Sequence, residues 1–75
     1  MIINGNLCDY LSQDHDQNTI INVCKKNKTI IFSDRFKDIL FWLISDYLQY
    51  KVLDIQNFYD SNEDKYITYV IIDKE

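Results

Sequence analysis

The sequence predicts an α+β domain in which a single amphipathic helix packs on a small antiparallel sheet of four or five strands. Two observations favour this class. Residues 33–51 carry apolar side chains at helical spacing. Segments rich in β-branched and aromatic residues lie on both sides of them, separated by short polar stretches. The expected order is therefore ββ(β)-α-ββ, and 75 residues make one compact domain, 1–75.

The segment 33–51 is expected to form the only helix longer than two turns. Ser33 is a favourable N-cap, and Asp34 would lie at the positive end of the helix dipole. One stripe would contain Phe36, Ile39, Leu40, Leu43, Tyr47 and Tyr50. Four further apolar residues fall outside it, namely Phe41, Trp42, Ile44 and Leu48. The helix would therefore present more apolar surface than one sheet face can cover.

The residues before this helix are expected to form two or three strands. Residues 6–12 alternate weakly and favour a short strand or hairpin, although Leu7, Tyr10 and Leu11 also fit one helical turn. A polar loop, 13–18, follows. Residues 19–24 and 29–33 are rich in β-branched residues and predict two strands. The tight loop between them contains Asn27, which can adopt the left-handed conformation that a hairpin turn requires.

The residues after the helix are expected to form a hairpin. Residues 52–59 and 65–73 predict its strands, and 60–64 its turn. The last strand is apolar on both alternations, with Tyr69 on one face and Val70 on the other. Because one helix covers only one face of a sheet, we expect self-association, as a homodimer, or a partner protein to cover the rest.

Charge and composition limit the classes of partner and compartment. Twelve acidic and eight basic residues give a net charge of −4. This balance argues against a protein that binds nucleic acid directly by neutralising phosphates. No apolar run reaches the roughly 18 to 20 residues that cross a membrane, and the first residues lack the pattern of a signal peptide. We therefore expect a cytoplasmic protein with Cys8 and Cys24 as free thiols, although a disulfide between them remains an alternative.

No motif indicates a metal or a cofactor. Residues 60–64 read D-x-N-x-D, as at the start of a calcium loop, but Lys65 replaces the expected glycine and Ile71 the closing glutamate. Asp14, His15 and Asp16 offer potential ligands, yet no paired spacing of histidine or cysteine accompanies them. We expect a solvated hairpin turn at 60–64, a polar loop around His15, and no cofactor.

No combination of residues indicates catalysis. His15 is the only histidine, and no serine or cysteine lies near it in a recognisable dyad or triad. The single glycine excludes the familiar glycine-rich phosphate loops. We therefore expect a protein that is not an enzyme, with a small hydrolytic or metal-dependent enzyme using His15 as the third alternative.

The candidate binding residues are aromatic side chains and carboxylates. Phe41 and Trp42 lie outside the helical stripe and are either core residues or interface anchors. Two acidic sets could enter a basic groove of a nucleic-acid enzyme. The first, on the expected helix, is Asp34, Asp38 and Asp46, and the second, at the hairpin turn, is Asp60, Glu63 and Asp64.

The leading functional hypothesis is a small acidic protein that acts by binding another protein. The chain lacks alanine and proline and has one arginine but many isoleucine, asparagine and lysine residues, which indicates an AT-rich genome. These features suit a phage or mobile-element inhibitor of a host defence enzyme, of the anti-CRISPR type, acting in the host cytoplasm. Nucleic-acid mimicry is one way in which it could act. The alternative is a structural subunit that serves oligomer assembly.

Overall fold

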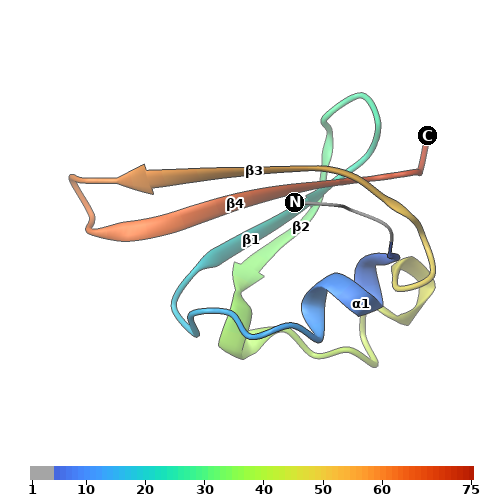
Figure 1. The fold of residues 1–75 in the computed structure, drawn as a ribbon, viewed down its shortest axis with the longest axis horizontal. Coiled ribbons are helices and arrows are strands. Elements are labelled where there is room, and N and C mark those ends of the chain that lie inside the picture. Colours follow the sequence, from blue (N-terminus) through green and yellow to red (C-terminus); the bar gives the residue numbers. More distant parts are fainter. Residues whose placement is uncertain (1–4) are drawn as a thin grey trace.

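The computed structural model describes residues 5–75 and has a small α+β fold with little helix (Figure 1). The only α-helix in this range is short, and four strands form one sheet. In chain order the elements are α1 (Leu7–Leu11), β1 (Ile20–Cys24), β2 (Ile30–Arg35), the 3-10 turns η1 (Phe36–Asp38) and η2 (Ser45–Tyr47), β3 (Val52–Asp60) and β4 (Lys65–Ile72). The four strands predicted at 19–24, 29–33, 52–59 and 65–73 are thereby confirmed. Residues 1–3 are apolar in the sequence, and they lie outside the described residues.

The sheet is mixed, whereas the sequence predicted an antiparallel one. Its strand order is β2-β1-β4-β3. The two outer pairs are antiparallel hairpins, but the central strands β1 and β4 run parallel. Parallel order requires a crossover of a dozen or more residues. Residues 36–51 provide it, because they carry the chain across one face from the β2 edge to the β3 edge.

The predicted helix over 33–51 is wrong. β2 pairs with β1 through Asp34 and Arg35, so Ser33 and Asp34 are strand residues and cannot begin a helix. The rest of the segment consists of turns and two short 3-10 turns. This irregular path directs residues both on and off the predicted stripe toward the core, namely Phe36, Ile39, Phe41, Ile44, Tyr47, Leu48 and Tyr50. A straight helix could not do so, and aromatic and β-branched residues also lower helix propensity.

Residues 7–11 form α1 instead of the favoured strand, in agreement with the helical alternative. Asn6 and Asp9 cap it reciprocally: the Asp9 N–H donates to Asn6 Oδ1 at 2.9 Å, and the Asn6 N–H donates to Asp9 Oδ2 at 3.1 Å. The N–H groups of Leu7 and Cys8 have no acceptor within the helix, and they donate hydrogen bonds to the carbonyls of Tyr50 and Leu48, both at 2.9 Å. The first turn of α1 is therefore fixed to the end of the crossover.

One face of the sheet carries the hydrophobic core. Ile21 and Val23 of β1 pack there against Val70 and Ile72 of β4, with Val52 beside them. Leu7, Tyr10 and Leu11 of α1 cover these side chains together with Ile44 of the crossover. In Figure 1, α1 and residues 36–51 lie on the same side of the sheet. The opposite face has no such cover within residues 5–75, and it is called the open face below.

The β1–β2 hairpin turns through Lys28 rather than through the predicted Asn27. Lys28 has a φ of 70°, in the left-handed region. Asn27 contributes its side chain, because Asn27 Oδ1 accepts a hydrogen bond from the Thr29 N–H at 3.0 Å. In the second hairpin Asp64 is left-handed, with a φ of 50°. None of the helices in residues 5–75 is long and apolar enough to cross a membrane.

Candidate protein-binding surface

Three apolar side chains project to solvent from one tight turn in the crossover, residues 40–43, called the Trp42 turn below. Trp42 is 72% exposed and Leu43 63% exposed, and Leu40 is also exposed. The turn closes where the Leu43 N–H donates to the Leu40 carbonyl at 2.9 Å. Phe41 and Ile44 point the other way and pack into the core. The core packing of Phe41 and Ile44 therefore holds the turn in place. Of the two alternatives for Trp42, a position in the core is excluded by its exposure.

A groove of about 190 Å³ lies between the outer edge of β2 and the Trp42 turn. Phe32, Ser33 and Asp34 line one side, and Asp38, Ile39, Leu40, Leu43 and Ile44 line the other. Asp34 and Asp38, from the predicted acidic set, therefore lie at the same groove. Arg35 Nε contacts Asp38 Oδ2 at 3.2 Å and balances part of this charge. The groove combines an apolar wall with carboxylates.

Asp46 does not belong to this groove. It lies in η2, one turn further along the crossover, and it is exposed. The sequence-based prediction grouped it with Asp34 and Asp38 because all three would belong to one helix. Without that helix, only two members of the set come together.

The second acidic set lies at the β3–β4 turn, at the far end of the sheet from α1 and the crossover (Figure 1). Its carboxylates have partners within the turn. Asp60 Oδ1 accepts the Asn62 N–H at 3.0 Å, and the Tyr59 hydroxyl donates to Asp64. Lys65 Nζ lies 2.5 Å from Glu63 Oε2. These contacts raise the pKa of Tyr59 and of Lys65. Glu63 and Asp64 are exposed and Asp60 is half-buried, but all three carboxylates have hydrogen-bond or ion-pair partners within the turn.

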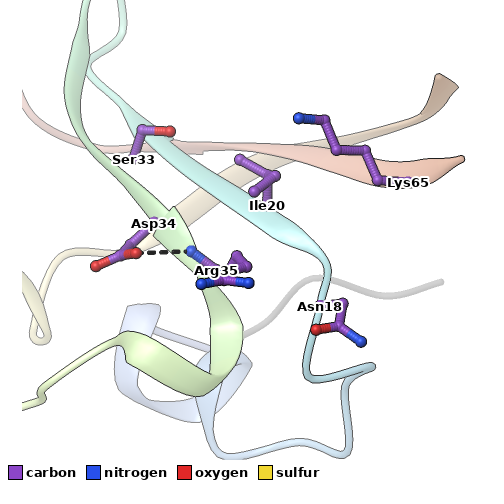
Figure 2. A pocket seen from close by; sticks show the side chains of 6 residues that line it. All are labelled: Asn18, Ile20, Ser33, Asp34, Arg35 and Lys65. Atoms are coloured by element: carbon purple, nitrogen blue, oxygen red, sulfur yellow. Dashed lines mark hydrogen bonds between the residues drawn. The ribbon is translucent and has the colours of Figure 1, made fainter. Parts of the chain in front are cut away.

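The open face carries a third set of residues, which the sequence did not single out. Figure 2 shows six side chains around an open pocket of about 520 Å³, including Ile20 of β1, Arg35 of β2 and Lys65 of β4. A second hollow of about 340 Å³ is lined by Cys24, Lys28, Ile30, Gln56, Phe58, Tyr69 and Ile71. The alternation of residues along the strands predicted apolar side chains on both faces of the sheet. It could not show which lysine and arginine side chains lie beside them.

His15, which was considered for catalysis and metal binding, packs within the protein, and the two cysteines form no disulfide. His15 Nε2 lies 2.7 Å from the Tyr10 carbonyl oxygen, and the imidazole packs between the rings of Tyr10 and Phe36. Cys8 and Cys24 are free thiols, and burial raises the pKa of Cys24. Within residues 5–75 no three metal-ligating side chains form a group. The loop of His15 therefore has a packing role that the sequence did not reveal.

No family model matches this chain, and neither a curated protein nor a solved structure matches it.

Proposed function

We propose that the protein is non-catalytic and acts by binding another protein through the Trp42 turn. The observation that supports this proposal is the exposure of Trp42 beside Leu43 and Leu40 on a turn anchored in the core. Tryptophan is the residue type most enriched among side chains that dominate binding energy. Contiguous exposed apolar side chains also favour an interaction site over a solvated loop.

The groove beside the turn indicates what the partner presents. Asp34 and Asp38 favour a basic side chain close to an apolar one, because opposite charges across an interface speed encounter and fix its register. Both acidic sets have local partners, since Arg35 contacts Asp34 and Asp38 just as the β3–β4 turn holds its own carboxylates. Asp34 and Asp38 are favoured over the hairpin set because they line a groove next to the exposed Leu40 and Leu43.

Within this class, the proposal is an inhibitor encoded by a phage or mobile element, of the anti-CRISPR type, with a host defence enzyme as its target. The small size, the acidity and the AT-rich coding support it. An oligomer-assembly subunit is the second candidate, and the open face of the sheet favours it. The two differ in whether a host protein binds to the Trp42 turn.

The test is affinity capture from a host lysate with wild type, Trp42→Ala and the control Tyr66→Ala. Tyr66 is also an exposed aromatic residue, but it lies on β4. We expect Trp42→Ala to lose the captured protein at least tenfold and to keep the wild-type melting temperature, because its side chain is mostly in solvent. The control should capture as wild type does. Equal capture by Trp42→Ala and wild type would contradict the proposal.

A further inference from the structure

The open face of the sheet is made of three rows of side chains that the strand register defines. The rows, written from β2 through β1 and β4 to β3, are Arg35-Ile20-Ile67-Phe58, Ser33-Asn22-Tyr69-Gln56 and Ile30-Cys24-Ile71-Asp54. Ile21 and Val23, which alternate with the open-face residues along β1, point to the other face of the sheet and into the core. The middle of the open face is mainly apolar: Ile20, Ile67 and Tyr69 are half-buried there, whereas Asn22, Cys24 and Ile71 are already buried. The rings of Phe58 and Tyr69 contact each other edge to face, with their centroids 5.6 Å apart.

Charge on the open face is divided between its two edges. Arg35 lies on the β2 edge, and Lys28, from the hairpin turn that leads into β2, lines the hollow of this face. Asp54 and Asp60 lie on the β3 edge, on the same side of the sheet as Gln56 and Phe58. Gln56 Nε2 donates to Asp54 Oδ2 at 3.2 Å, in agreement with this shared side. Lys65 of β4 lies beside Asp60 on this face as well, but its Nζ is paired with Glu63 Oε2. The apolar middle thus lies between a basic edge with Lys28 and Arg35 and an edge on which Asp54 and Asp60 carry the unbalanced charge.

We infer that the open face binds the open face of a second copy of this chain, with β2 of one copy over β3 of the other. A twofold axis parallel to the strands gives this arrangement. It places Lys28 near the partner's Asp54, and it places Arg35 near the partner's Phe58 and Asp60. Each contact occurs twice, as in any isologous interface.

The distribution of charge selects this orientation over the other twofold arrangement. An axis across the strands would place β2 over β2 and β3 over β3. Lys28 would then face the partner's Arg35, and Asp54 would face the partner's Asp60, so that like charges oppose each other. The interface also needs sufficient area. About 800 Å² per partner is usual for a stable complex, which is about a sixth of the 5088 Å² surface of the described residues.

The inference is independent of the Trp42 turn, because the crossover that carries that turn covers the other face of the sheet. Loss of capture by Trp42→Ala and loss of the dimer are therefore separate results. Trp42→Ala should remain a dimer.

The test is sedimentation equilibrium of the whole protein between 1 and 200 μM with charge-reversal variants. Wild type should show the mass of two chains at the upper concentrations. Lys28→Glu and Asp54→Lys should each weaken association at least tenfold, and the double variant should recover most of it because the contact is restored with reversed signs. The controls Lys37→Glu and Asp46→Lys change the same charges in the crossover, away from the open face.

Circular dichroism at each concentration separates unfolding from dissociation. Lys28 lies on an exposed hairpin turn, so Lys28→Glu should keep the folded spectrum even if Asp54→Lys does not. A wild-type mass of one chain at 200 μM would overturn the inference. A dimer that Lys28→Glu leaves unchanged, or that the control variants weaken equally, would overturn this interface.

Discussion

Asn6 and Asp9 show how few contacts hold the short helix α1. Each side chain accepts a hydrogen bond from the backbone N–H of the other residue. The only glycine of the chain, Gly5, makes room for this contact, because a Cβ atom there would lie 2.7 Å from Asp9 Oδ2. A helix of five residues is unstable by itself. Its cap and its packing on the sheet therefore stabilise it together.

Replacing the cap residue should lower stability without changing the fold. Asn6→Ala removes the acceptor for the Asp9 N–H, and we expect a loss of about 1 kcal/mol in the free energy of unfolding. Urea denaturation measures this loss. Asn18→Ala is the control, because the Asn18 side chain lies in a polar loop outside the helix. A loss below the error of the measurement would mean that packing alone holds α1.

The crossover, residues 36–51, differs most from its sequence-based prediction and allows a sharp test. The predicted helix placed Leu43 on the core stripe and Ile44 outside it. The structure reverses these positions, with Ile44 9% exposed and Leu43 63% exposed. Ile44→Ala should therefore cost about 2 to 5 kcal/mol in the free energy of unfolding. Leu43→Ala should cost less than about 0.5 kcal/mol. Chemical denaturation of the two variants measures both values, and the opposite ranking would favour the helix.

The strands could be predicted from sequence, but the crossover could not. β1 and β2 carry β-branched residues in short runs, and this local signal agrees with their final environment. In 36–51 the helical period is real, yet the segment must also connect two sheet edges and point Phe41 and Ile44 inward. That requirement comes from the topology, which local spacing does not encode. The same limit applies to the candidate site: from sequence Trp42 could be either a core residue or an interface anchor, and the structure shows that it is exposed and that Asp46 lies apart from Asp34 and Asp38.

Whole-molecule stability should decline at alkaline pH. Burial raises the pKa of Cys24 from its ordinary value of 9.0, and it raises that of Tyr10 from 10.0, although a hydrogen bond with Thr68 offsets part of the latter effect. The folded protein therefore holds these protons more tightly than the unfolded chain does. Their contribution is complete below about pH 9 and is lost as pH rises through the folded values.

Urea denaturation between pH 7 and pH 11 tests this dependence. The free energy of unfolding should change little up to about pH 8.5 for these two groups and then fall. Tyr10→Phe and Cys24→Ala together should reduce the slope above pH 9, whatever they cost at neutral pH. An unchanged slope in the double variant would assign the alkaline loss to other groups.

The parallel pairing of β1 with β4 determines when the sheet can be completed. It joins residues 20–24 to residues 67–71, from near the two ends of the described chain. Each outer hairpin can close early because its strands are neighbours in sequence, whereas the central pair requires closure of a long loop, which slows folding. During synthesis, β1 and β2 can pair long before β4 exists. Ile21 and Val23 therefore lack their final neighbours Val70 and Ile72 until β4 has left the ribosome.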